Sequence, residues 1–177
     1  MFATIGLLLW LAQDAIRSCA CDPVQPATLE ERACSLTKEA ITHASSAEPV
    51  FFLKDINPRK ANRTLALPKK TTSGVYTLDG YSAAERTEMW TAAITKAKAL
   101  WGENWAVAYN GDKVRTQCQV HIHIGKLNTA AKVSKFTEVS RPSQIPAPKG
   151  AGIWIYSQGG KLRVHAGEQI TETALVR

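Results

Sequence analysis

The feature that most constrains this fold is the alternating stretch Gln119-Val-His-Ile-His-Ile124. Polar and apolar residues that alternate in this way are typical of a β-strand with one face in the core. The side chains predicted to lie in the core are Val120, Ile122 and Ile124. The opposite face is predicted to carry Gln119, His121 and His123.

His121 and His123 are one strand repeat apart, roughly 6–7 Å. Two imidazoles on one face can bind a metal, or can serve as a nucleophile and its helper. The pattern fits two solvent-exposed histidines equally well. A metal site is the least favoured of these readings, because the sequence offers no third ligand at metal-binding spacing.

The segment before this strand, 109–116, has the composition of an anion-binding turn. It contains amide and hydroxyl side chains, including Asn110 and Thr116, together with the cations Lys113 and Arg115. Such donors favour a phosphate or carboxylate ligand. Aspartyl-phosphate or two-metal chemistry would instead need clustered carboxylates, which this stretch does not contain.

With this turn and strand together, the sequence resembles the histidine-triad (HIT) superfamily. Its members carry a strand His-φ-His-φ-His-φ, in which a histidine attacks the α-phosphate of a nucleotide. The resemblance makes His121 the nucleophile and gives His123 a hydrogen bond to the phosphate. Gln119 replaces the first histidine; its amide can orient a neighbour but cannot shuttle a proton at neutral pH.

A second match is the pair of segments Leu53-Lys-Asp-Ile-Asn-Pro58 and Leu65-Ala-Leu-Pro-Lys-Lys70, which resembles the early hairpin of the superfamily. The resemblance implies that Asp55 and Asn57 contact the ribose of the nucleotide. The two matches cover residues about 50–127. The lead-in 115–117 and the Leu-Lys-Asp-φ-Asn segment are most similar to the CDP-diacylglycerol pyrophosphatase branch.

The resemblance also assigns the phosphate-binding residues, which are Asn110, Arg115, Thr116 and Gln117. A weaker similarity to the same branch, at 165–172, makes His165 a further candidate. The implied function is hydrolysis of a nucleoside diphosphate compound through a nucleotidyl-histidine intermediate, with release of a nucleoside monophosphate. The alternative is a basic nucleotide- or nucleic-acid-binding module that has lost turnover.

The predicted fold class is α+β, with an antiparallel sheet of about five central strands. Two helices are predicted at 29–43 and 82–101, each preceded by a capping box, at Thr28 and Ser82. Apolar residues make up 45% of the chain and charged residues 21%, as in ordinary globular domains. We therefore expect an N-terminal apolar segment and linker, 1–27, and a single domain, 28–177.

The net charge of +7 suits a phosphate-bearing partner. Several cations, including Lys60 and Arg63, surround the predicted hairpin, where most are expected to be solvated. The partner expected from the resemblance is a nucleotide-containing small molecule, lipid-linked in the branch named above. Peripheral membrane contact and a homodimer are further expectations, and no cofactor is expected.

The apolar run 2–12 has the length of a signal-peptide core, and 18–20 resembles a cleavage site. Export to an oxidising compartment or the periplasm is therefore expected. The alternative is a cytoplasmic protein whose first residues form an amphipathic helix, because no Lys or Arg precedes the run. In an exported chain, a disulfide would join Cys19 or Cys21 to Cys34.

Some HIT proteins hold a structural zinc ion through a Cys-x-x-Cys pair and a histidine. In this chain Thr37 stands at the second cysteine position of Cys34-Ser-Leu-Thr37, and Thr71 at the histidine position. Zinc requires four nitrogen or sulfur ligands. We therefore expect no structural zinc ion and no metal requirement for activity.

Overall fold

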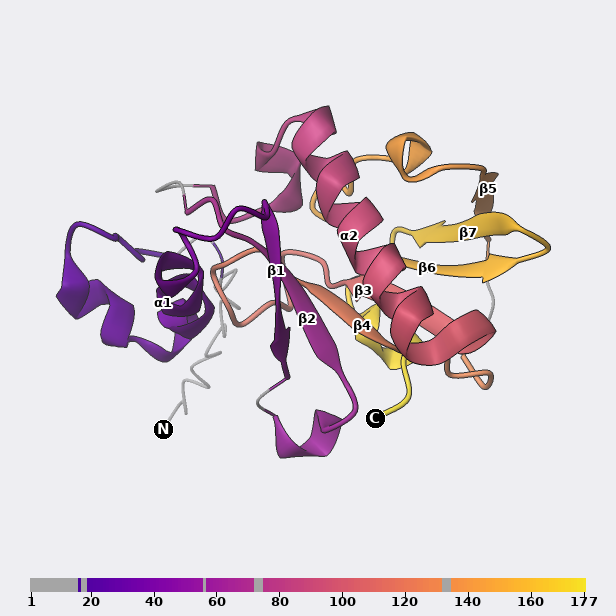
Figure 1. The fold of residues 1–177 in the computed structure, drawn as a ribbon, viewed down its shortest axis with the longest axis horizontal. Coiled ribbons are helices and arrows are strands. Elements are labelled where there is room, and N and C mark those ends of the chain that lie inside the picture. Colours follow the sequence, from indigo (N-terminus) through magenta and orange to yellow (C-terminus); the bar gives the residue numbers. More distant parts are fainter. Residues whose placement is uncertain (1–15, 17–18, 56, 72–74, 132–134) are drawn as a thin grey trace, which may run out of the picture.

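The computed structural model describes residues 16, 19–55, 57–71, 75–131 and 135–177. The apolar run 2–12, on which the export prediction rests, lies outside the described residues. Within them, the fold is α+β and consists of an antiparallel sheet with two α-helices, as the sequence predicted (Figure 1). Among the described residues, no helix combines the length and the apolar character needed to cross a membrane.

The sheet has seven strands in the order β1-β2-β4-β3-β6-β7-β5. They are β1 (Val50–Lys54), β2 (Thr64–Pro68), β3 (Trp105–Tyr109), β4 (Ile122–Lys126), β5 (Thr137–Val139), β6 (Ile153–Gln158) and β7 (Lys161–Ala166). The expectation of about five strands was too low. The C-terminal hairpin β6–β7 continues the central sheet by pairing β6 with β3, and β5 adds a further strand by pairing with β7.

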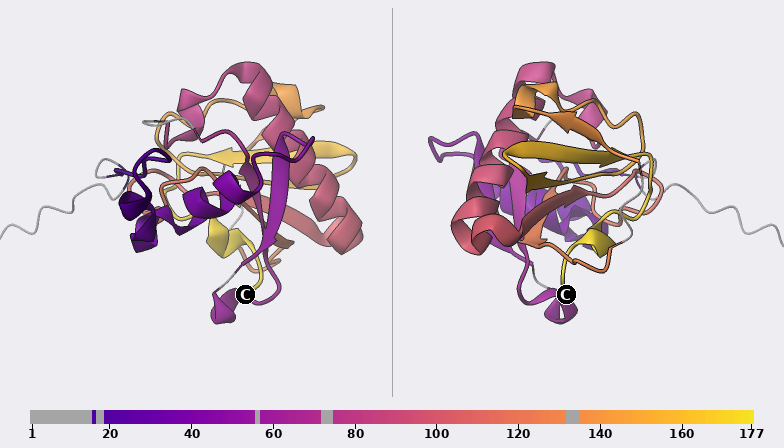
Figure 2. Two further views of the ribbon diagram at one scale, coloured as in Figure 1. Left: turned by 60° about the vertical axis from the view of Figure 1, so that its left-hand side comes forward. Right: turned by 90° about the vertical axis from the view of Figure 1, so that its right-hand side faces the viewer.

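Helix α2 (Ala83–Trp101) covers one face of the sheet (Figures 1 and 2). The predicted capping box is present, since Ser82 and Glu85 each accept a hydrogen bond from the other's backbone N–H. The buried face of α2 packs on Val120, Ile122 and Ile124, which confirms the inward face of the alternating stretch.

The predicted helix 29–43 is shorter than expected. Two 3₁₀ turns, η1 (Pro26–Glu30) and η2 (Arg32–Cys34), precede α1 (Ser35–Thr42). Thr28 caps no α-helix, because its hydroxyl donates to the Gln25 carbonyl and accepts from Asp22 N. Glu31 has an extended backbone, which separates the two turns and delays the start of the α-helix.

Two disulfides attach the N-terminal segment to the domain, Cys19–Cys118 and Cys21–Cys34. The second is one of the two pairings that the sequence left open. The first was not predicted, because its cysteines lie 99 residues apart.

Strand β4 lies between β2 and β3 in the sheet. The two histidines are on the face of the sheet opposite α2. His121 immediately precedes β4 and His123 is its second residue. The β1–β2 turn, the segment before β4 and the C-terminal turn η7 (Glu172–Ala174) meet around these two histidines. This convergence forms the cavity described next.

Candidate active site

A cavity of about 290 Å³ opens at the predicted histidine pair. Most of the residues that line it are polar or charged. They are Arg32, Ser35, Leu36, Asp55, Asn57, Lys60, Leu65, Asn110, Val114, Arg115, Thr116, Gln117, His121, His123 and Glu172. Eight of the ten predicted site residues are among them, and only Gln119 and His165 are not.

The imidazole of His121 is buried and fixed by one hydrogen bond. Its Nδ1 lies 2.9 Å from the carbonyl oxygen of Gln119. A carbonyl only accepts, so Nδ1 carries the proton and Nε2 of the neutral ring keeps its lone pair. Burial, reinforced by the positive charge of Arg115, lowers the pKa of His121 to about 4. The ring is therefore neutral at neutral pH, with Nε2 able to act as a nucleophile.

His123 stands edge-on to His121, with ring centroids 4.9 Å apart. Burial, followed by the neighbouring His121, lowers its pKa well below the usual value, so it is neutral too. Its Nε2 lies 3.5 Å from Glu172 Oε2, and its Nδ1 lies 3.8 Å from Asp55 Oδ2. Nδ1 is buried and has no hydrogen-bond partner among the described residues.

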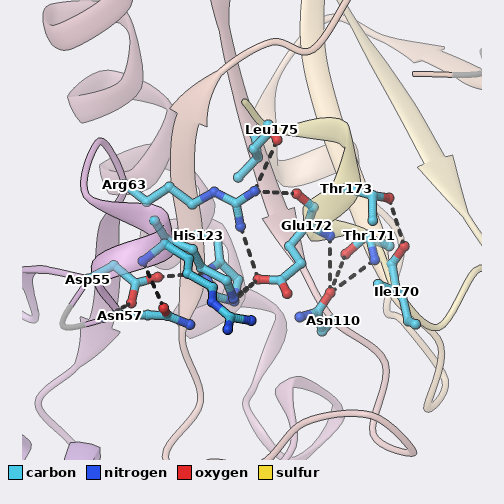
Figure 3. A network of polar contacts seen from close by, with 12 residues as sticks. Asp55, Asn57, Arg63, Asn110, His123, Ile170, Thr171, Glu172, Thr173 and Leu175 are labelled. Carbon is cyan, nitrogen blue, oxygen red and sulfur yellow. Dashed lines mark hydrogen bonds and ion pairs between the residues drawn. The ribbon is translucent and has the colours of Figure 1, made fainter. Parts of the chain in front are cut away.

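Glu172 is a site residue whose role the sequence did not predict (Figure 3). Arg63 Nη1 donates to its Oε2 at 3.0 Å, and Lys60 Nζ lies 2.5 Å from the same oxygen. Arg63 is 2% exposed, so the expectation that the hairpin cations are solvated is wrong for this residue. It also donates to the carbonyls of Glu172, Leu175 and Val176, and so holds the C-terminal segment on the sheet.

Arg115 brings a buried positive charge to the cavity wall. Its guanidinium stacks over the Tyr109 ring at 5.0 Å and donates through Nη2 to the Tyr76 carbonyl. Asp112 Oδ1 lies 3.6 Å from Nη2. Nε and Nη1 are buried without a hydrogen-bond partner among the described residues. Buried cationic donors of this kind favour an anionic ligand.

The remaining predicted phosphate-binding residues have mixed roles. Thr116 is an exposed residue at the cavity lining. Asn110 Oδ1 accepts from the backbone N–H groups of Thr171 and Glu172, and therefore positions the C-terminal segment. The Gln117 side chain donates to the Arg32 carbonyl and accepts from Ser35 Oγ. It thus holds the N-terminal segment against the cavity.

Asp55 and Asn57, the predicted ribose contacts, both line the cavity at the β1–β2 turn. Asp55 Oδ1 accepts from the Asn57 backbone N–H at 3.0 Å, which leaves Oδ2 toward His123. Asn57 Oδ1 accepts from Arg59 N and begins the turn at Pro58.

Gln119 points away from the cavity. Its amide donates to the carbonyls of Pro68, at 3.0 Å, and Lys70, at 3.5 Å. The side chain therefore attaches the segment before β4 to the end of β2. It acts on His121 only through its backbone carbonyl.

His165 lies outside the cavity as well. It stacks on Trp154 with ring centroids 3.8 Å apart and the planes nearly parallel. Its pKa is lowered, chiefly by burial. This candidate from the sequence is a packed residue of β7 and is not gathered with the histidine pair.

No protein-family model and no curated protein matches this chain. The cavity itself combines a neutral imidazole with an available Nε2, a buried guanidinium and two carboxylates. Such a set can bind a phosphorylated ligand that carries hydroxyl groups, and can attack its phosphorus.

Proposed function

We propose that this chain hydrolyses nucleoside diphosphate compounds of the CDP-diacylglycerol kind at a HIT-like site. The observation that carries the proposal is the hydrogen bond from His121 Nδ1 to the Gln119 carbonyl. It fixes the tautomer that leaves Nε2 free, and burial keeps the ring unprotonated. A neutral imidazole is a good nucleophile near neutral pH.

In the first step, the Nε2 lone pair of His121 attacks the α-phosphorus. The bond from phosphorus to the bridging oxygen breaks, and its electron pair leaves with the second phosphate. Water then attacks the nucleotidyl-histidine, the N–P bond breaks and a nucleoside monophosphate is released. Arg115 neutralises charge on the phosphates throughout, because its buried guanidinium lies at the cavity wall and its Nε and Nη1 have no hydrogen-bond partner among the described residues.

The ribose of the substrate would lie beside Asp55. A hydroxyl placed between Asp55 Oδ2 and His123 Nδ1, which are 3.8 Å apart, could donate to either acceptor. It would thereby supply the hydrogen-bond partner that Nδ1 lacks. Thr116 and Arg115 would then face the phosphates.

The orientation of Gln119 bears on the leaving group. No side chain stands ready at the first triad position to donate a proton, because this amide is bonded to Pro68 and Lys70. A departing phosphate monoester, with a second pKa near about 6, is stable as an anion at neutral pH. A phosphoric anhydride therefore suits this site better than an ester with an alcohol leaving group.

The second candidate is a nucleotide-binding module without turnover. It is favoured by the same orientation of Gln119 and by the net charge of +7. In that case the cavity would bind a nucleotide through Arg115 and Asp55, and His121 would only pack against the phosphate.

Incubation of the purified full chain with CDP-diacylglycerol and a panel of dinucleotides distinguishes the two. The hydrolase releases a nucleoside monophosphate, and an acid-labile, base-stable label from the α-phosphate is trapped on wild type but not on His121→Ala. Nucleotide binding with neither release nor label would establish the binding module instead.

We also propose that the protein works in an oxidising compartment. Cys19–Cys118 and Cys21–Cys34 are compatible with export, because disulfides persist where thiols are not kept reduced. Fractionation of the producing cells, with the protein found only in the cytoplasm, would refute this placement.

A further inference from the structure

We propose that the two disulfides are a redox switch for the cavity, which takes its ligand-binding shape only after they form. The proposal rests on the proposed function for the identity of the ligand. The switch acts on the N-terminal wall, defined here as Arg32, Ser35 and Leu36, the residues of the N-terminal segment and α1 that line the cavity.

Four cysteines form one cluster beside this wall. The sulfur atoms of Cys21, Cys34 and Cys118 lie within 4.8 Å of one another, and Cys19 is bonded to Cys118. The first three residues are almost completely buried, whereas Cys19 is half-buried. Both disulfides therefore share one small space.

Each disulfide also contains a cysteine that is adjacent in sequence to a residue of the cavity wall. Cys118 stands between Gln117, whose side chain holds the wall, and Gln119, whose carbonyl fixes His121. Cys34 immediately precedes Ser35 and is the N-cap of α1. The backbone N–H of Cys118 donates to the Ala33 carbonyl at 2.8 Å, so the two chain segments run against each other.

Besides the disulfides, the chain before α1 is held by the partly buried Leu29 and Ala33 and by hydrogen bonds from Gln117, Cys118 and Tyr76 to its carbonyls. The turn η1 buries none of its residues, and η2 buries only Cys34. Short 3₁₀ turns are weak on their own, because nucleating a turn costs more than its few hydrogen bonds return. By contrast, α1 packs through Leu36 and Ala40 on the sheet. Reduction is therefore expected to loosen residues 19–34 while α1 and the sheet persist.

The switching step is thiol–disulfide exchange with a dithiol reductant. A thiolate of the reductant attacks the half-buried sulfur of Cys19, and Cys118 leaves as a thiolate. The second thiol of the reductant then attacks the mixed disulfide, which frees Cys19 and leaves the reductant as a cyclic disulfide. The Cys118 thiolate lies close enough to attack the Cys21–Cys34 disulfide, which forms a new disulfide with one of these cysteines and releases the other as a thiolate. A second dithiol then reduces the new disulfide, so that two dithiols in all are oxidised to cyclic disulfides.

In a reducing compartment the chain up to Cys34 would be loose, Arg32 would leave the wall, and the cavity would bind nucleotides weakly. Oxidation would close both disulfides and bring Arg32 into place beside Ser35 and Leu36, which α1 holds at the cavity in both states. An exported hydrolase with this switch would not hydrolyse nucleotides inside the cell that makes it, because the cavity would form only after export.

The test compares oxidised and dithiol-treated full chain. Cytidine monophosphate binding is measured by calorimetry, and backbone hydrogen exchange is measured along the chain. We expect reduction to weaken binding by about 5- to 150-fold, the range of ordinary coupling between sites. Exchange should speed up over residues 19–34 and stay unchanged in β3 and β4, and reoxidation should restore both.

Two variants distinguish the contributions of the two disulfides. Cys19→Ser/Cys118→Ser keeps the buried disulfide and should bind weakly in both redox states. The variant in which all four cysteines are replaced by serine should show no response to the reductant. If reduction unfolds the wild type altogether, the Cys19→Ser/Cys118→Ser variant decides, because it retains one disulfide.

The two proposals fail in different ways. Equal binding and equal protection of residues 19–34 in both redox states would overturn the switch and leave the hydrolase untouched. Redox-dependent binding without turnover would overturn the hydrolase and leave the switch in place. If the oxidised chain binds no cytidine monophosphate, hydrogen exchange of residues 19–34 decides, and unchanged exchange there rejects the switch.

Discussion

The imidazole of His121 hydrogen-bonds through Nδ1 to the carbonyl two residues earlier, a contact that orients the ring without using Nε2. His123 differs in this respect, since its Nε2 faces Glu172 and its Nδ1 faces Asp55. The two neighbouring histidines therefore present different nitrogens to a ligand. This difference predicts different consequences when each is removed.

We expect His121→Ala to lower turnover by several orders of magnitude, because no other group can form the covalent intermediate. His123→Ala should cost less, since it supports the ligand without bonding to phosphorus. The measurement is steady-state hydrolysis together with nucleotide affinity, which His121→Ala should retain through Arg115 and Asp55. His43→Ala, a remote histidine stacked on Phe51, is the control. Turnover by His121→Ala within about tenfold of wild type, roughly 1.4 kcal/mol of barrier, would contradict the assignment.

Arg115→Met tests the buried guanidinium. Loss of the charge should weaken nucleotide affinity strongly, because charge-assisted hydrogen bonds to phosphate are among the strongest contacts available. The thermal midpoint should change much less, because two of the donor nitrogens have no hydrogen-bond partner within the described part of the chain. Calorimetric binding and thermal unfolding measure the two effects. A large loss of stability with unchanged affinity would make Arg115 a structural residue.

The sequence alone indicated that the candidate site contains the histidine pair, Asp55 and Arg115, because each of them lies in a local motif. Glu172 could not be predicted as a site residue in this way. It meets Lys60 across 112 residues of chain, and no local pattern reports that contact. Gln119 illustrates the converse: its place in the motif predicted a catalytic role, but two nearby carbonyls at the end of β2 bind its amide.

Among the elements, those with a clear local period were predicted correctly. The hairpin β1–β2 and the helix α2 lie where the sequence placed them. Strand β5 was missed because its three residues are too few to display a period and depend on pairing with β7. The start of α1 was wrong because the segment before it is shaped by contacts with residues 117–118, which are distant in sequence.

The side chain of Gln119 connects the segment before β4 to the end of β2, so we expect it to contribute to the stability of the fold. Gln119→Leu removes the donor to the buried Pro68 carbonyl, at a cost of about 1–3 kcal/mol, whereas the Lys70 carbonyl keeps its hydrogen bond from the Tyr81 hydroxyl. Chemical denaturation measures this cost. The kcat of the remaining folded protein should fall only modestly, since the backbone carbonyl that orients His121 is still present. A loss of kcat as large as that of His121→Ala, at unchanged stability, would restore the catalytic role of the side chain.

The C-terminal segment is a second such connection. Arg63 joins β2 to the carbonyls of Glu172, Leu175 and Val176. Arg63→Met should therefore release η7 and with it Glu172, and breaking a buried pair of this kind costs about 3–5 kcal/mol. Hydrogen exchange over 172–176 and thermal unfolding would record the loss. Unchanged protection of that segment would show that the packing of Leu175 alone holds it.

In the whole molecule, the cavity depends on chain segments from both ends of the sequence. The two disulfides attach the N-terminal segment beside the cavity, and hydrogen bonds from Arg63 hold η7 there. The central motifs 50–127 therefore supply the proposed nucleophile and the proposed phosphate contacts, while the flanking segments complete the enclosure. The motifs alone indicate which central residues meet at the cavity, but not the flanking residues that determine its shape.

Burial of neutral histidines also makes the stability of the whole fold depend on pH. The pKa of His121 is lowered from 6.5 to about 4, and that of His123 is lowered as well. Between these values the unfolded chain binds more protons than the folded one, so stability rises with pH across this window. The contribution of His121 is fully present above pH 6.5 and is lost as the pH falls toward 4.

We therefore expect the free energy of unfolding to fall by about 3 kcal/mol for His121 alone as the pH drops from 6.5 to 4. Denaturant unfolding between pH 4.5 and 7 isolates this effect. The carboxylate of Glu85, whose pKa is lowered to about 2 chiefly by its hydrogen bond with Lys70, loses its contribution only below about 4.5. The double variant His121→Gln/His123→Gln should flatten most of the slope, with the buried His165 accounting for the rest. A wild-type stability that stays constant from pH 7 to 4.5 would mean that the two imidazoles titrate normally, and the neutral, nucleophilic His121 would have to be abandoned.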